Sequence, residues 1–201
     1  MQSEAQTKTL AYYAEHAEEF VFLSRDIDFS GIQNAFLSYL PPEGTILDLG
    51  CGSGRDSKAF IDKGYKVVAV DGSEELCRSA GQFIGQPVIC STFQEYTPEI
   101  SFDGIWACAS LLHLSSKDEV ASVMTRMANH LNPGGCFYAS FKYGDFSGER
   151  KGRYFTDMTE TSLTEMIREI PSLRIDRLHI TTDVRPGRHD EKWINAFLMK
   201  N

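Results

Sequence analysis

The segment TILDLGCGSGRD, residues 45–56, holds the residues with the most direct chemical meaning in this sequence. Gly50, Gly52 and Gly54 follow a short apolar run and precede a helical pattern. Glycines this closely spaced let the backbone turn sharply, and a ligand can lie against the amide N–H groups with no Cβ in the way. Asp71 ends the next apolar run, where its carboxylate can accept hydrogen bonds from both hydroxyls of a ribose. The spacing therefore indicates a site for a nucleoside-containing cofactor.

The residues around the glycines distinguish this site from a dinucleotide site. Arg55 occupies the position of the third glycine in the dinucleotide pattern G-x-G-x-x-G. Asp48 stands two residues before Gly50, and its carboxylate would repel a pyrophosphate but attract an amino group. S-adenosylmethionine has both a ribose and an α-amino group, so the sequence predicts it as the cofactor. The alternative, a plain tight turn, is disfavoured by the strand, the helix and Asp71.

Length and composition limit the other classes of protein. The 201 residues predict a single domain, and the net charge of −8 disfavours a nucleic-acid partner, because phosphate backbones are bound mainly by clustered Lys and Arg. The five cysteines form no CxxC pair or metal-ligand spacing, so no metal is expected and they fit a reducing compartment. No apolar run approaches the ~18 residues of a membrane span. A cytoplasmic protein without a membrane partner is expected.

The elements that must position the glycine turn alternate along the chain. Helices are predicted at 9–23 and at 30–40, where Ser30 is the expected N-cap. Short apolar runs predict strands at 45–49, 66–70, 87–90, 103–109 and 135–141, separated by helices at about 55–63, 73–84 and 116–131. Continuous apolar strands are typical of a parallel sheet covered by helices on both faces. The pattern therefore predicts a doubly wound α/β fold.

The end of the chain breaks this alternation. A helix at about 159–170 is followed by strands at 173–183 and 192–200, and only eight residues separate these two strands. Eight residues cannot hold a crossover helix, so the two strands must form an antiparallel hairpin.

Five segments, LDLGCGSGRD, VVAVDGS, FDGIWACASLLHL, LNPGGCFYASFKYG and DVRPGR, together resemble the class I S-adenosylmethionine-dependent methyltransferases, particularly small bacterial ones of the tellurite-resistance type. The resemblance implies a Rossmann-like methyltransferase fold with three α/β/α layers. Its doubly wound, mostly parallel seven-stranded sheet would have an antiparallel last strand. It also implies an N-terminal helical lid over residues 1–42 and a cofactor-binding domain over 43–201.

The resemblance also implies which residues surround the cofactor. The glycines would pass beneath it, Asp71 and Gly72 would meet the ribose, and Phe93 would flank the adenine. Many relatives have Asp where this sequence has Thr92, so Thr92 or the backbone would replace the usual acceptor for the adenine amino group. The full expected set is Tyr12, Asp48, Gly50, Cys51, Gly52, Gly54, Arg55, Asp71, Gly72, Ser73, Thr92, Phe93 and Ala107.

Candidate catalytic residues lie in segments expected at the carboxyl ends of the strands, where open α/β sheets bind ligands. His113, after the fourth strand, is the best candidate for a general base, because imidazole can take a proton at neutral pH. Tyr13, on the predicted lid beside Tyr12, is a second candidate, since an aromatic face can also stabilise a sulfonium. Methyl transfer depends strongly on positioning, so a base need not be essential. The alternative for His113 is a structural histidine bonded to the backbone at a helix start, and the alternative for Tyr13 is simple packing of an amphipathic helix.

Basic residues are enriched in the same loops. Residues 140–157 carry four basic and three acidic side chains, and residues 183–192 carry three of each, so these loops are slightly positive in an acidic chain. We expect the substrate, a small and anionic molecule, to contact Tyr143, Arg153, Arg185 and Arg188. A solvated loop is the alternative reading.

The leading hypothesis is an enzyme, monomeric or homodimeric, that methylates a small molecule and releases S-adenosylhomocysteine. A methyltransferase acting on tRNA or protein is disfavoured by the charge and by ASLLH, which stands where amino-methylating nucleic-acid enzymes have an NPPY-type tetrapeptide. A non-catalytic S-adenosylmethionine-binding module is the third hypothesis. An NAD-dependent oxidoreductase is disfavoured by Arg55 and Asp48.

Overall fold

Seven α-helices, one 3-10 turn and nine strands are present in the computed structural model, which describes residues 4–185 and 187–201. The helices are α1 (Glu4–Glu15), α2 (Ala17–Ser24), α3 (Ser30–Leu37), α4 (Arg55–Asp62), α5 (Glu74–Ile84), α6 (Lys117–Ala128) and α7 (Glu160–Arg168), and the 3-10 turn is η1 (Leu111–His113). The strands are β1 (Thr45–Leu49), β2 (Lys66–Asp71), β3 (Ile89–Cys90), β4 (Phe102–Ala107), β5 (Leu131–Lys142), β6 (Ser147–Arg150), β7 (Arg153–Thr156), β8 (Leu173–Thr182) and β9 (Lys192–Lys200).

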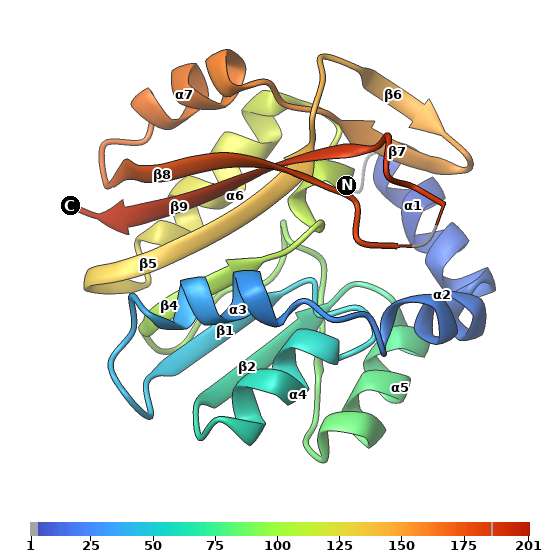
Figure 1. The fold of residues 1–201 in the computed structure, drawn as a ribbon. Helices are drawn as coiled ribbons and strands as arrows, with labels where there is room; N and C mark the ends of the chain where they lie inside the picture. Colours follow the sequence, from blue (N-terminus) through green and yellow to red (C-terminus); the bar gives the residue numbers. More distant parts are fainter. Residues whose placement is uncertain (1–3, 186) are drawn as a thin grey trace.

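A seven-stranded sheet with the order β3-β2-β1-β4-β5-β9-β8 forms the centre of the fold (Figure 1). Strand β9 runs antiparallel to both of its neighbours, β5 and β8, while the other pairs are parallel. The predicted doubly wound sheet with an antiparallel last strand is therefore confirmed. The chain passes from β3 at one edge back to β4 beside β1, so a crevice for ligands lies at the carboxyl ends of these strands.

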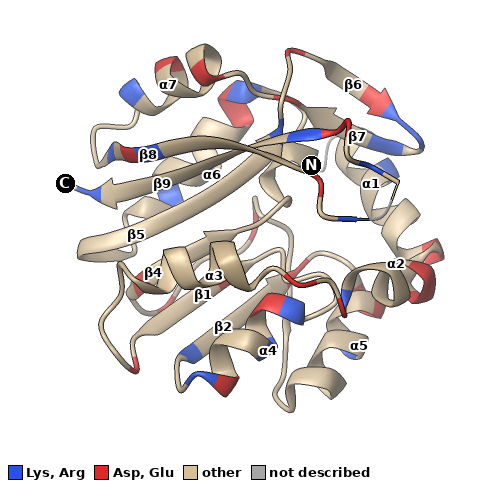
Figure 2. Ribbon diagram, viewed as in Figure 1, with Lys and Arg blue, Asp and Glu red and all other residues tan. Residues whose placement is uncertain are grey.

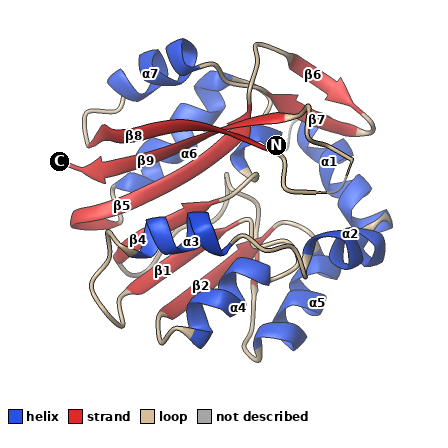
Figure 3. Cartoon of the chain, viewed as in Figure 1, coloured by secondary structure: helices blue, strands red, loops and turns tan. Residues whose placement is uncertain are grey.

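Helices cover both faces of the sheet, which makes three layers (Figure 3). Side chains that alternate along the strands point to opposite faces. Ile46 and Trp106 pack with residues of α3, α4 and α5, whereas Leu47 and Ile105 pack with residues of α6 and α7. On the first face, the ring of Trp106 stacks on Tyr138 at 4.0 Å between ring centroids. Such buried aromatic pairs stabilise a core by roughly 0.5–1.5 kcal/mol beyond the area they bury.

The two largest departures from the predicted elements lie near the expected ligand site. The helix predicted at 9–23 is divided into α1 and α2 at His16, whose ring stacks on Tyr12. Residues 147–156, which have no predicted element, form the β6–β7 hairpin. Ser30 is not the N-cap of α3, because Phe29 occupies that position and Asp28 accepts the hydrogen bond of the Ser30 amide.

Candidate functional site

A cavity of about 430 Å³ lies at the carboxyl ends of the parallel strands. Its walls come from the glycine turn after β1, the segments after β2, β4 and β5, the helices α1 and α2, and the chain between β8 and β9. Thirteen of the residues predicted from the sequence line it: Tyr13, Gly50, Cys51, Gly52, Arg55, Asp71, Gly72, Thr92, Phe93, His113, Arg153, Arg185 and Arg188.

The glycine turn is held against the end of β2 by Asp71. One carboxylate oxygen of Asp71 accepts a hydrogen bond from the Gly52 amide at 2.8 Å, and the other accepts one from the Ser73 amide at 3.0 Å. Burial raises the pKa of Asp71, and these backbone donors oppose that shift. Gly50 is required by its φ of +89° and by space, because a Cβ there would lie 2.4 Å from the Cβ of Ser110. The turn therefore presents bare backbone and a carboxylate to the same cavity.

Helices α1 and α2 rest on the segment after β2 and on the glycine turn. A Cβ on Gly72, just after β2, would lie 2.7 Å from a methyl group of Leu10 on α1, so this helix and the segment after β2 are in close contact. Arg25, which follows α2, donates to the Ser53 carbonyl at 3.1 Å and to the Ser79 hydroxyl at 3.1 Å. The N-terminal helices thus form one wall of the cavity.

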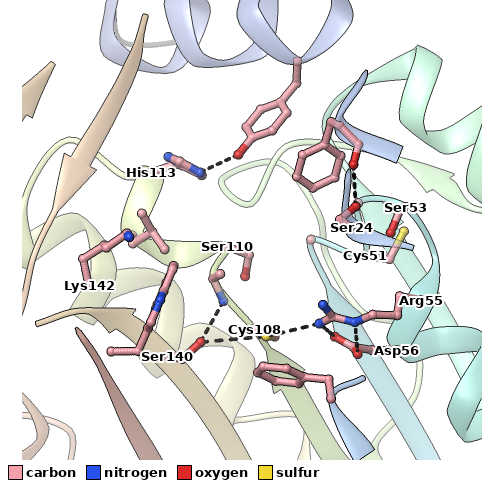
Figure 4. Close-up of a pocket in the computed structure, with 18 of the residues that line it drawn as sticks. Ser24, Cys51, Ser53, Arg55, Asp56, Cys108, Ser110, His113, Ser140 and Lys142 are labelled. Atoms are coloured by element: carbon pink, nitrogen blue, oxygen red, sulfur yellow. Dashed lines mark hydrogen bonds and ion pairs between the residues drawn. The ribbon is translucent and has the colours of Figure 1, made fainter. Parts of the chain in front are cut away.

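Tyr13 and His113 form a hydrogen-bonded pair inside the cavity, and His113 lies at the upper left of Figure 4. The Tyr13 hydroxyl lies 2.9 Å from Nε2 of His113, and Nδ1 of His113 lies 2.7 Å from the carbonyl oxygen of Tyr154. That carbonyl can only accept, so Nδ1 carries the proton and Nε2 accepts from Tyr13. Burial, with help from the charge of Arg153, lowers the pKa of His113 to about 4. His113 is therefore neutral at pH 7.

The pKa of His113 gives a testable prediction. Because it lies below the unfolded value of about 6.5, the unfolded chain binds the proton first as the pH falls. We expect His113 to destabilise the fold by about 3 kcal/mol as the pH falls from about 6.5 to about 4, since one pKa unit corresponds to about 1.4 kcal/mol. Ring NMR shifts should titrate near pH 4, and unfolding of wild type and His113→Gln should diverge across this window. A His113 titration near 6.5 would contradict the buried, neutral pair.

Cationic side chains line the cavity beside this pair. Arg185 donates through Nε to the buried Asp183 carboxylate at 2.8 Å, and this partner lowers the pKa of Asp183 against the effect of burial. Lys142, at the end of β5, contacts Glu191 and lies 4.5 Å above the Trp193 ring. Burial lowers the pKa of Lys142 to about 8, and the neighbouring arginines contribute. The basic residues that line the cavity come from β5 (Lys142), from β7 (Arg153) and from the β8–β9 loop (Arg185 and Arg188). Figure 2 shows Lys and Arg near the carboxyl ends of the strands.

A buried ion pair forms the floor of the cavity (Figure 4). Arg55 donates through Nε and Nη2 to the two carboxylate oxygens of Asp56, both at 2.8 Å. Asp56 also accepts from Gln33 at 2.7 Å and from the Trp106 indole at 2.9 Å. Burial lowers the pKa of Arg55, but the Asp56 charge outweighs burial and raises it above its ordinary value. Arg55 thus has a structural partner that the sequence does not reveal.

Asp48 does not occupy its predicted position. It is buried within β1, does not line the cavity, and accepts a hydrogen bond from the Ser57 hydroxyl at 2.6 Å. Burial, followed by the charge of Asp56, raises the pKa of Asp48. That its carboxylate attracts the cofactor's amino group stays a prediction.

Other predicted site residues also lie outside the cavity, and each has a local role. Gly54 has φ of +79° at the N-terminus of α4 and packs against α5, and the Ser73 hydroxyl caps α5 by accepting from the Leu76 amide. Ala107 is fully buried in β4. Tyr12 lies over Arg153, and the Tyr143 hydroxyl donates to Glu160 at 3.2 Å. None of these five lines the cavity.

Several cavity residues are absent from the predicted set. They are largely at strand ends or in the segments that follow them: Cys108, Ser110, Ser140, Lys142, Asp183, Trp193 and Asn195. Ser140 links the end of β5 to the segment after β4, because its hydroxyl accepts from the Ala109 amide at 2.9 Å and lies 3.9 Å from the Cys108 sulfur. Their position in the sequence could have identified some of them, since Cys108, Lys142 and Asp183 stand at or just after the carboxyl ends of strands.

Comparison with protein families gives one matching domain. Residues 46–135 match a family described as a methyltransferase domain, and this range contains the glycine turn, Asp71 and His113. In the part of the chain that the structure describes, no helix has the length and apolar character needed to cross a membrane.

Two curated relatives share part of the chain. YqeM, a methyltransferase-family protein of Bacillus subtilis (strain 168), is 34% identical over 118 residues, which cover 53% of this chain and 47% of the relative. The cypemycin N-terminal methyltransferase of a Streptomyces species is 31% identical over 106 residues, which cover 50% of this chain and 43% of the relative. The chain thus matches about half the length of these relatives.

A solved structure matches the whole fold. The 1,6-didemethyltoxoflavin-N1-methyltransferase of Burkholderia thailandensis, solved with its substrate and S-adenosylhomocysteine, has a TM-score of 0.78 and 20% identity. The match covers 100% of this chain and 92% of that one. At this identity the likeness establishes the methyltransferase fold.

Proposed function

We propose that this chain is a class I S-adenosylmethionine-dependent methyltransferase that methylates a small-molecule acceptor and releases S-adenosylhomocysteine; the methyltransferase-domain match over residues 46–135 and the sheet order support this. The observation that carries the proposal is the Asp71 carboxylate. It is buried, bonded to the glycine turn and facing the same cavity as the Tyr13–His113 pair.

The cavity residues fit S-adenosylmethionine. Asp71 keeps acceptor capacity for the ribose, because its two carboxylate oxygens offer about four lone-pair sites and the backbone amides of Gly52, Gly72 and Ser73 do not use all of them. The bare backbone of Gly50 and Gly52 allows close approach, and Thr92 and Phe93 line the cavity beyond Asp71, where the adenine would lie. When bound, the cofactor supplies an electrophilic methyl group on a positively charged sulfur.

Tyr13 and His113 would prepare the acceptor. The Tyr13 oxygen donates to His113 and lies 3.3 Å from an Arg153 nitrogen, so its remaining lone pair can accept the proton of the acceptor group. As that proton reaches Tyr13, the hydroxyl proton of Tyr13 passes to Nε2 of His113. The Tyr154 carbonyl holds the resulting imidazolium through Nδ1–H. His113 therefore acts through Tyr13 rather than directly on the acceptor.

The N-terminal residues 1–42 would act as a lid over the bound ligands. Supporting this, Gln6, Leu10, Tyr13 and Phe20 of α1 and α2 line the cavity. Residues 1–3 of this range lie outside the described part of the chain. The tellurite-resistance subtype, the cytoplasmic location and the monomeric or homodimeric state stay predictions. The named relatives are named for different acceptors, the N-terminus of cypemycin and N1 of 1,6-didemethyltoxoflavin, so their names do not identify this chain's acceptor.

Turnover of an acceptor panel tests this function. Incubation with S-adenosylmethionine and a panel of small organic acids, phenols and amines should yield S-adenosylhomocysteine with at least one acceptor. For that acceptor, Tyr13→Phe should lower kcat by about 100-fold, the lower end of general acid–base effects, and change KM less. Mass spectrometry of both products provides the measurement.

Tyr65→Phe is the matched control, because Tyr65 precedes β2, outside the cavity. It should retain wild-type kcat. Cofactor binding without turnover of any acceptor would favour the non-catalytic module, and salt-sensitive binding of bulk tRNA would favour a nucleic-acid substrate.

A further inference from the structure

Arg153, the first residue of β7, differs from the other arginines around the cavity in having no acidic partner. Arg55 and Arg185 each bond an aspartate, and Arg150 on the same hairpin bonds Asp157 at 2.9 Å. No ion pair of Arg153 is found within residues 4–185 and 187–201. Its Nε is buried and has no hydrogen-bond partner. Half-buried guanidinium groups are normally paired, so this arginine has the character of a ligand-binding group.

Aromatic rings hold the Arg153 guanidinium in place. It lies 4.6 Å from the centroid of the Tyr12 ring, 5.3 Å from that of Phe155 and 5.7 Å from that of Tyr13. Its one hydrogen bond to another described residue joins Nη1 to the Tyr13 oxygen at 3.3 Å. Ring contacts stabilise a cation and fix its plane but leave N–H groups free. The planar edge of the Arg153 guanidinium is therefore preorganised to donate two hydrogen bonds to a group with two oxygens.

The surrounding charge also favours an anion. Lys142, Arg153, Arg185 and Arg188 all line this side of the cavity, and the acidic partners of Lys142, Arg185 and Arg188 are Asp183 and Glu191. Burial lowers the pKa of Arg188, and repulsion from Arg185 and Arg153 lowers it further. Four cations thus face two carboxylates, and one bound anion would relieve their repulsion.

We infer that Arg153 binds a carboxylate of the methyl acceptor, so that the substrate of this site is a small organic acid; the inference rests on the methyltransferase function proposed above. A carboxylate matches the planar guanidinium edge through two parallel N–H···O bonds. Bound there, it lies beside the Tyr13 oxygen, so the same arginine sets both the charge class and the position of the acceptor. The competing occupant is the carboxylate of the cofactor's own methionine.

Binding of a simple probe acid separates these occupants. Benzoate and its neutral analogue benzamide are titrated by calorimetry into protein saturated with S-adenosylhomocysteine, using wild type, Arg153→Gln and Arg150→Gln. Arg150 is the matched control, because it lies on the same hairpin with its own aspartate and does not line the cavity. Wild type and Arg150→Gln should bind benzoate at least about tenfold more tightly than benzamide, and Arg153→Gln should lose that preference, a change of about 1.4 kcal/mol.

Three results would overturn the inference: no benzoate binding by wild type, equal binding of benzoate and benzamide, or unchanged benzoate preference in Arg153→Gln. A loss of S-adenosylhomocysteine affinity in Arg153→Gln would also overturn it, because Arg153 would then hold the cofactor's carboxylate. Failure of the methyltransferase proposal has a different signature: wild type itself would not bind S-adenosylhomocysteine.

Discussion

Asp71→Ala should lower the affinity for S-adenosylhomocysteine by about 100-fold. The substitution removes the carboxylate expected to bind both ribose hydroxyls, and hydrogen bonds to a charged group contribute about 1.5–3 kcal/mol each. It also releases the Gly52 amide, which Asp71 holds at 2.8 Å, so the glycine turn loses its tie to β2. Both effects act on the part of the cavity formed by the glycine turn and Asp71, where the cofactor is expected to bind. The loss should therefore concern cofactor binding before any acceptor is involved.

Isothermal titration with S-adenosylhomocysteine measures this loss. Asp62→Ala is the control, because Asp62 is exposed on α4 and pairs only with Lys58 one turn away. Far-ultraviolet circular dichroism establishes that both variants are folded. An Asp71→Ala protein that is folded and binds S-adenosylhomocysteine like wild type would refute the cofactor site described here.

Asp56→Ala should destabilise the protein by about 3–5 kcal/mol, the range found when one partner of a buried ion pair is removed. Arg55 would remain buried without its carboxylate, and the Gln33 and Trp106 donors would lose their acceptor. Because Arg55 also lines the cavity floor, the cavity around it should become disordered along with the global loss of stability.

Urea unfolding of wild type, Asp56→Ala and the double variant Arg55→Met/Asp56→Leu tests the cause. The double variant should recover much of the stability, because replacing both ions with apolar groups removes the unpaired charge. Asp62→Ala again serves as the control and should change stability by less than about 1 kcal/mol. If Asp56→Ala cost no more than that control, the buried network would have no structural role.

The features that sequence predicted correctly depend on local geometry. A strand, a sharp glycine turn and a helix follow one another within residues 45–62, so the positions of Gly50 and Gly52 follow from their spacing. Asp71 ends the neighbouring parallel strand, and parallel strands place their carboxyl ends at one edge of the sheet. The same rule brought His113, which follows β4, to the cavity.

The features that the sequence did not reveal depend on contacts between distant residues. The charge of Asp48 depends on its burial and on Asp56, neither of which the local sequence displays. The β6–β7 hairpin turns at Lys151 and Gly152, with φ of +53° and +76°, and lysine is not among the residues that usually mark such a turn. This unexpected hairpin supplies both Arg153 and the Tyr154 carbonyl that fixes His113. The acceptor half of the site was therefore harder to predict than the cofactor half.

The most direct test of the central claim is a calorimetric titration of the wild-type chain with S-adenosylmethionine, repeated with NAD. We predict one molecule of S-adenosylmethionine bound per chain, with a dissociation constant of about 100 μM or lower, within the usual range for enzyme ligands, and no binding of NAD. Binding of NAD in place of S-adenosylmethionine, or the absence of S-adenosylmethionine binding, would contradict the assignment of this cavity to a methyltransferase.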